Sequence, residues 1–90
     1  MPAVTAVPRL RRGVRLGYDP VRQSPVVLFP EGVLLLNTTA EAVLKLCDGL
    51  SSLDEIVTGL REQFTGVRED QVGAVLEFLA DRHVVSWEDV

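Results

Sequence analysis

The spacing of apolar residues changes once along the chain, at about residue 36. Before that point apolar positions alternate with arginines and a glycine: Leu10, Val14, Leu16 and Tyr18. A period of two is typical of a strand with one buried face. Further on, apolar residues recur every three or four positions, which is the period of a helix. We therefore expect strands over 9–37 and helices over 38–83.

Three strands are expected in the first part. The alternating segment forms the first, and turn-forming residues follow it at 19–24. Val26-Val27-Leu28-Phe29 is β-branched and aromatic and predicts the second, and Val33-Leu34-Leu35-Leu36 predicts the third. Pro30-Glu31-Gly32 is a tight connection between them. All five prolines lie in this part, so the proline-flanked strands are expected near the edges of a small antiparallel sheet.

Three helices are expected next. Thr38-Thr39-Ala40-Glu41 has the form of a capping box, and Gly49 closes the helix that follows it. A second capping box, Ser52-Leu53-Asp54-Glu55, starts the next helix, and an acidic pair at 69–70 suits the start of the third. Their apolar faces follow helical spacing: Ala40, Val43, Leu44 and Cys47; Leu53, Ile56, Val57, Leu60 and Phe64; and Val72, Val75, Leu76 and Leu79, with Phe78 at the margin.

This order predicts an α+β fold resembling a winged helix-turn-helix, with a small three-stranded antiparallel sheet followed by three helices. The 90 residues are enough for one core and one domain over 1–90. Residues 1–8 are expected to be flexible, and residues 84–90 to form an extended tail.

The charge of the chain divides where the hydropathy pattern does. Residues 1–30 carry a net +4 and residues 31–90 a net −8. The third expected helix, which would read DNA in a winged helix, has four acidic side chains: Glu69, Asp70, Glu77 and Asp81. Such a surface repels phosphate, so DNA binding is the less favoured alternative. The N-terminal arginines fit a minor-groove arm and, equally well, solvated charges on an edge strand.

Counting residue types excludes most cofactor sites. One cysteine and one histidine cannot supply the ligands of a zinc site or an iron–sulfur cluster. The only lysine, Lys45, does not follow a glycine, and the glycines form no dinucleotide-binding pattern. No apolar stretch approaches the roughly 20 residues of a membrane span, and no signal segment opens the chain. We expect a cytoplasmic protein without a cofactor.

Candidate catalytic groups have simpler structural explanations. The carboxylates lie mainly at helix starts and exposed helical positions, where capping accounts for them. His83 is expected at a helix end, and Cys47 on an apolar helix face, where it would be a core residue. An enzyme is therefore not expected. The third strand is a candidate for pairing with an extended peptide if its edge is free, although covered core explains it equally well.

Four segments together are similar to one known family. They are Pro8-Arg9-Leu10-Arg11-Arg12-Gly13-Val14-Arg15-Leu16, Leu28-Phe29-Pro30-Glu31-Gly32-Val33-Leu34-Leu35-Leu36-Asn37, Leu46-Cys47-Asp48-Gly49 and Glu55-Ile56-Val57. The chain resembles the PqqD family of pyrroloquinoline quinone biosynthesis over about residues 8–85. The Pro-Glu-Gly turn, followed at a fixed distance by Leu-Cys-Asp-Gly, is the most specific part of the resemblance.

The resemblance implies a peptide chaperone, that is, a single peptide-recognition domain without chemistry of its own. Such a chaperone binds the ribosomally made precursor peptide PqqA and presents it to the radical SAM enzyme PqqE. A recognition element for a different modified precursor would share the same motifs, so it remains an alternative.

The resemblance also implies a site, in which the peptide adds to the third strand and lies against the third helix. The corresponding residues are Val33, Leu34, Leu35, Leu36 and Asn37 on the strand, and Gln71, Val75, Phe78, Leu79 and Arg82 on the helix. Arg82 would anchor an acidic side chain, whereas Val75 and Leu79 are equally explained as core. As a separate hypothesis, a docking face for the enzyme is expected at Arg9, Arg11, Arg12 and Arg15.

Overall fold

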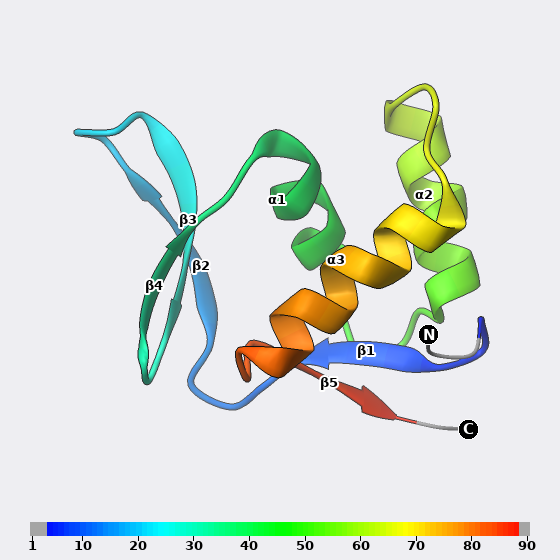
Figure 1. The fold of residues 1–90 in the computed structure, drawn as a ribbon, viewed down its shortest axis with the longest axis horizontal. Coiled ribbons are helices and arrows are strands. Elements are labelled where there is room, and N and C mark those ends of the chain that lie inside the picture. The colour runs from blue at the N-terminus through cyan, green and yellow to red at the C-terminus, as the bar shows by residue number, and fades with distance from the viewer. Residues whose placement is uncertain (1–3, 89–90) are drawn as a thin grey trace.

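The computed structural model describes residues 4–88 and is α+β with three helices, as predicted (Figure 1). The elements follow one another as β1 (Val7–Leu10), β2 (Arg15–Asp19), β3 (Ser24–Phe29), β4 (Gly32–Leu35), α1 (Thr38–Lys45), α2 (Leu53–Gln63), α3 (Glu69–Asp81) and β5 (Val85–Glu88). The strand layout differs from the prediction, because five strands form two sheets: β1-β5 and β2-β3-β4.

The expected first strand is two strands that belong to different sheets. A turn separates β1 from β2, and in it Gly13 has a φ of +82°, a left-handed conformation that favours glycine. Over residues 85–88 the expected C-terminal tail is extended, but it is a strand, β5, that pairs antiparallel with β1, while residues 89–90 lie outside the described part of the chain. β1 begins at Val7, and Ala6 is buried, so residues 6–8 are not the flexible segment that was expected. Residues 1–3 lie outside the described part of the chain.

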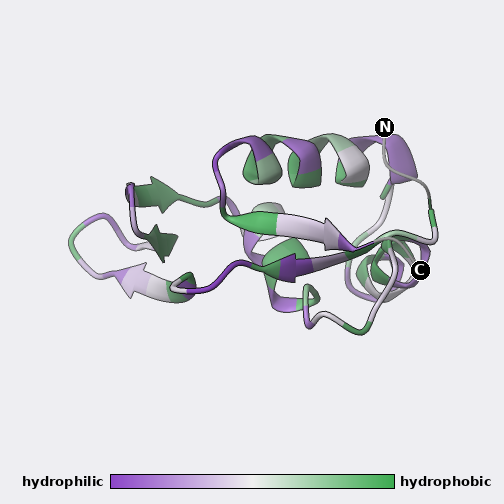
Figure 2. Ribbon diagram, turned by 90° about the horizontal axis from the view of Figure 1, so that it is seen from below, coloured by the Kyte–Doolittle hydropathy of each residue, from purple (hydrophilic) through white to green (hydrophobic). Residues whose placement is uncertain are grey.

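β2, β3 and β4 form an antiparallel sheet, the wing, which projects from the helical body (Figure 2). The expectation that proline-flanked strands lie near the edges is wrong for β3, which is the central strand. Pro25 has no N–H to donate across to Leu36. The hydroxyl of Ser24 donates to the Leu36 carbonyl instead, at 3.2 Å, and the Leu36 N–H donates to the Pro25 carbonyl at 2.8 Å. Proline is therefore accommodated in the middle of the sheet.

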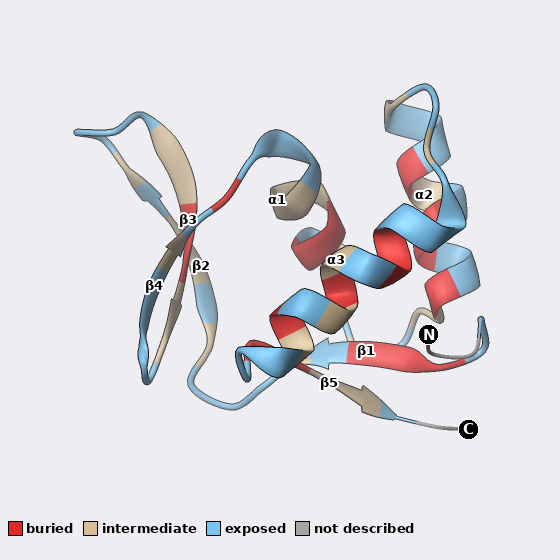
Figure 3. Ribbon diagram, in the orientation of Figure 1, coloured by how far each residue is buried: buried red, intermediate tan, exposed pale blue. Residues whose placement is uncertain are grey.

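The core lies between the three helices, the β1-β5 ladder and one face of the wing (Figure 3). The helical spacings in the sequence predicted most of the buried residues of α1, α2 and α3. Ala40, Phe64 and Val75 are only half-buried, and Gly73 is buried although it was not predicted to be. The largest fully buried side chains include Leu44, Leu53, Ile56, Leu60, Leu76 and Leu79. Packing of these side chains fixes α3 relative to the wing, and this placement creates the site described below.

One of the two predicted capping boxes is present. At α2, Ser52 and Glu55 cap each other's backbone N–H groups, at 3.3 and 2.9 Å. At α1 the prediction is wrong, because the N-cap is Asn37, whose side-chain oxygen accepts from the Ala40 N–H at 2.7 Å. Thr38 is therefore the first helical residue. α1 also ends earlier than expected, at Lys45, and Gly49 lies in the turn beyond it with a φ of +79°.

The assignment of Asn37 as the N-cap of α1 predicts the effects of two substitutions. Asn37→Ala should lower the free energy of unfolding by about 1 kcal/mol, because the Ala40 N–H loses its acceptor. Thr38→Ala should leave stability nearly unchanged, since its side chain caps nothing. Urea denaturation followed by circular dichroism measures both values. A larger loss from Thr38→Ala than from Asn37→Ala would show that the cap has been assigned to the wrong residue.

Candidate functional site

The outer edge of β4 is free within residues 4–88, where no strand pairs with it. The Leu36 N–H points back to β3, where it meets the Pro25 carbonyl at 2.8 Å. Backbone groups alternate in direction along a strand, so those of Leu34 also point to β3. The N–H and C=O groups of Val33 and Leu35 must then point away from the sheet. β4 thus presents a short ladder of backbone donors and acceptors.

An apolar groove of about 410 Å³ lies beside this edge, between β4, α1 and α3. We call it the β4–α3 groove; it is lined by Leu34, Leu35, Leu36, Asn37, Ala40, Ala74, Val75, Phe78 and Leu79. Leu79 is only 2% exposed, whereas Phe78 is 48% exposed. The difference in exposure follows from the helical period, which turns Leu79 into the core and leaves Phe78 at the margin of the buried apolar face of α3. The groove therefore has a buried aliphatic floor and an accessible aromatic rim.

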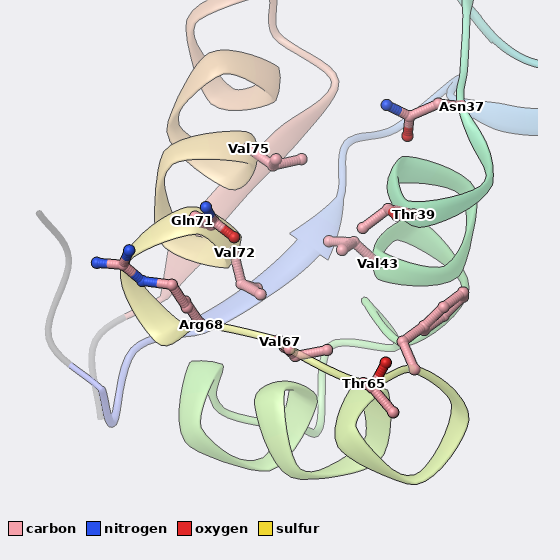
Figure 4. A pocket seen from close by; sticks show the side chains of 11 residues that line it. Asn37, Thr39, Val43, Thr65, Val67, Arg68, Gln71, Val72 and Val75 are labelled. Atoms are coloured by element: carbon pink, nitrogen blue, oxygen red, sulfur yellow. The ribbon is translucent and has the colours of Figure 1, made fainter.

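A second hollow of about 460 Å³ continues the groove towards the start of α3 (Figure 4). It shares Asn37 and Val75 with the groove, and side chains of α1 and α3 face each other across it. Its remaining lining residues are Thr39, Val43, Phe64, Thr65, Gly66, Val67, Arg68, Gln71 and Val72. Most of these residues were not predicted as site residues, because the loop between α2 and α3 has no periodic signal.

The structure brings most of the predicted peptide-contact residues together. Seven line the β4–α3 groove: Leu34, Leu35, Leu36, Asn37, Val75, Phe78 and Leu79. Gln71 lines the second hollow. Val33 lies on the same strand, with its side chain 57% exposed. Arg82 follows the last turn of α3, and its guanidinium stacks over the Phe78 ring at 4.6 Å from the ring centre, a cation–π contact.

The N-terminal arginines occupy a different part of the molecule. Arg9, Arg11 and Arg12 border a shallow hollow over the β1-β5 ladder. Arg9 is paired with Glu88 at 2.7 Å, so part of its charge is neutralised. Arg15 lies on β2 in the wing, in register with Leu28. Three of the four predicted docking residues therefore border one hollow, and the fourth, Arg15, lies on the other sheet.

Cys47 is a core residue and not a reactive thiol. It is buried, and its Sγ donates to the Val43 carbonyl at 3.3 Å. Desolvation raises the pKa of the Cys47 thiol from 9.0 to about 12, with a smaller contribution from the charge of Asp48. Since the thiolate is the nucleophile, this thiol is poorly suited to covalent chemistry at neutral pH.

The raised pKa of Cys47 predicts how stability depends on pH. The folded chain holds the thiol proton more tightly than the unfolded chain does. This contribution is fully present below pH 9 and is lost as the pH rises towards 12, by up to about 1.4 kcal/mol per pH unit. Urea titrations between pH 8 and about 11 should show a steeper loss of stability for the wild-type chain than for Cys47→Ala. Equal slopes would contradict the burial of the thiol.

Comparison with known proteins identifies the family. The chain matches the family model of coenzyme PQQ synthesis protein D (PqqD) over residues 25–85, which include β4, α3 and the groove between them. The chain belongs to the PqqD family. It is similar to the PqqA binding protein of Pseudomonas aeruginosa, with 40% identity over 97% of this chain and 94% of that protein. The PqqA binding protein of Azotobacter vinelandii is 43% identical over 90% of this chain and 87% of its own.

A solved PqqD structure has the same fold. It is the solution NMR structure of the PqqD part of Methylobacterium extorquens PqqCD, described as a functional, stand-alone recognition element for ribosomally made and modified peptides. The TM-score is 0.68 at 37% identity, covering 89% of this chain and 88% of that one. Within the described part of the PqqD-family chain, no helix is long and apolar enough to cross a membrane. The same residues hold no cluster of three potential metal ligands.

Proposed function

We propose that this chain is a peptide chaperone of pyrroloquinoline quinone biosynthesis, which binds the precursor peptide PqqA on β4 and does no chemistry of its own. The observation that supports this most is the free edge of β4 beside an apolar groove, in a chain of the PqqD family. A ribosomally made peptide is available in the cytoplasm, where we expect the chain to act.

The two parts of the site have complementary roles. Backbone pairing with Val33 and Leu35 supplies affinity and sets the register of the peptide, independently of its side chains. The groove then selects an apolar side chain, because its binding removes the half-exposed Phe78 ring and the other apolar lining residues from water. Arg82, whose guanidinium stacks over the Phe78 ring, contacts an acidic residue of the same peptide in this proposal. Together these contacts favour an extended, largely apolar segment.

An NMR titration of the labelled chain with synthetic PqqA tests the proposal. Saturable amide shifts should concentrate at residues 33–37 and 71–82. A scrambled PqqA of the same composition and duplex DNA serve as controls, and neither should cause these shifts. Saturation by the precursor of a different modified peptide, with no response to PqqA, would favour the alternative recognition element. Shifts confined to other parts of the chain would contradict the groove as the binding site.

We further propose that the radical SAM enzyme PqqE receives the bound peptide, and that the N-terminal arginines guide its docking. Arg11 and Arg12 are exposed, and no ion pair within residues 4–88 neutralises them. Exposed charges of one sign accelerate association with a surface of the opposite sign, chiefly at low salt. Arg9 contributes less to this face, because Glu88 already pairs with it.

Reversing these two charges should slow association with PqqE. We expect Arg11→Glu with Arg12→Glu to lower the association rate about tenfold at low ionic strength and much less at high ionic strength. The matched control reverses Arg22 and Arg61, which changes the net charge equally on other surfaces. Stopped-flow fluorescence measures the rates. Equal rates for the two double variants would reject docking through the N-terminal arginines.

A further inference from the structure

The wing has two faces, and both carry apolar side chains. Side chains alternate along each strand, so Val27 and its partner Leu34 point to the helices, and Val27 is fully buried. The next residues along each strand point to the opposite side, which we call the outer face of the wing: Arg15, Gly17, Val26, Leu28, Val33 and Leu35. Leu35 also borders the β4–α3 groove, because it lies on the edge strand where the two faces meet. A Cβ on Gly17 would lie 3.5 Å from the side chains of both Val26 and Leu28, which places these three residues on one face.

The outer face consists of two rows that run across the sheet. One row is Arg15, Leu28 and Val33, and the other is Gly17, Val26 and Leu35. Both rows end at the free edge of β4, where Val33 is 57% exposed and Leu35 is 55% exposed. Val26, in the middle of one row, is only 5% exposed, so the exposed apolar part of this face is its β4 edge. An exposed apolar edge invites unwanted pairing. Both rows therefore end at the edge of β4, where an added strand would continue them with its own side chains.

The register of an added strand follows from the hydrogen bonds of β4. Val33 and Leu35 are the residues whose backbone groups point outward, as the Leu36 N–H to Pro25 carbonyl bond requires. Side chains that are directly opposite each other lie on the same face of a sheet. The two added residues opposite Val33 and Leu35 therefore lie on the outer face. The residue between them, opposite Leu34, lies on the side of the β4–α3 groove.

We propose that the outer face of the wing is a second recognition surface for the bound peptide, on which Val33 and Leu35 select apolar side chains. This inference rests on the proposed pairing of the peptide with β4. If one face of the added peptide strand were exposed to water, only every second peptide residue would need to be apolar. Here both sides of the added strand meet apolar surface, so the recognised segment has at least three consecutive apolar residues. The middle one enters the groove, and its two neighbours extend the outer rows.

The test combines two protein variants with a scan of the peptide. The double variant Val33→Thr/Leu35→Thr removes apolar surface from the edge strand. Threonine is β-branched and favours strands, so β4 should remain intact. Val21→Thr, at a 90% exposed loop position of the wing, is the matched control. The probe is synthetic PqqA, in which each apolar residue is replaced in turn by serine, and affinity is measured by fluorescence anisotropy.

The double variant is expected to bind PqqA about tenfold more weakly than the wild-type chain, and Val21→Thr equally well. With the wild-type chain, serine substitution should lower the affinity at three adjacent peptide positions. The two outer positions should lose their sensitivity in the double variant, while the middle one keeps it. If the double variant bound PqqA with unchanged affinity, the outer face would not be a recognition surface. The same conclusion would follow if serine lowered the affinity only at alternate peptide positions. Binding in the β4–α3 groove would stand in either case.

Two other outcomes also decide the matter. If the wild-type chain sediments as a dimer and the double variant as a monomer, a second copy covers the outer face, and the inference is wrong. If the wild-type chain binds no PqqA at all, the proposed function fails together with this inference. Circular dichroism and urea titration of each variant confirm that any loss of affinity occurs in a folded chain.

Discussion

Replacing Leu35 with proline is expected to weaken PqqA binding about 10- to 100-fold without unfolding the chain. The Leu35 N–H points to the free edge of β4, so proline breaks no bond to β3. The added strand loses a backbone donor, and a peptide carbonyl is left without its partner. The proline ring also blocks close approach of another strand. Calorimetric titration with synthetic PqqA measures the loss.

The opposite edge of the wing supplies the control. Tyr18 lies on β2, and the same alternation directs its backbone N–H away from β3. Tyr18→Pro is therefore the same change at the opposite edge of the wing, which does not border the β4–α3 groove. We expect this variant to bind PqqA as the wild-type chain does. A similar loss for both variants would mean that proline acts through the sheet as a whole, and strand addition at β4 would lose its support.

The largest loss of stability is expected from Leu76→Ala, at about 3 kcal/mol in the free energy of unfolding. Leu76 is fully buried on α3, so its truncation leaves a cavity in the core. A domain of this size has only about 5–10 kcal/mol of stability, and the variant should unfold at a much lower urea concentration. Urea denaturation at constant pH measures the change.

Phe78→Ala on the same helix separates stability from binding. Phe78 is 48% exposed at the rim of the groove, so its removal should cost less than about 1 kcal/mol of stability. It should nevertheless weaken PqqA binding, because the groove loses its aromatic rim. If Phe78→Ala destabilised the chain as much as Leu76→Ala, Phe78 would be a core residue and not a contact for the peptide.

Much of the site was predictable because it lies on elements with strong local signals. The apolar period of α3 placed Phe78 beside the buried stripe and Leu79 within it, and the structure has both there. The Pro-Glu-Gly turn correctly separated β3 from β4. The second hollow was missed, because Thr65 and Val67 belong to a loop that becomes a wall only when α1 packs opposite it. Loops have no period from which such a contact can be inferred.

By itself, the sequence determined that three helices follow the β3-β4 hairpin, and it identified most of the buried positions on each helix. These properties depend on residues within one or two turns of each other, which is why periodicity reveals them. The sequence did not separate β1 from β2 or identify β5 as a strand. The tertiary structure alone decided that β1 pairs with β5, across almost the whole length of the chain. It alone also decided that β3 is the central strand, that no strand within residues 4–88 pairs with the outer edge of β4, and that α3 lies beside this edge. Such pairings depend on contacts distant in the sequence, where many registers satisfy the same local pattern and only packing of the whole core selects one.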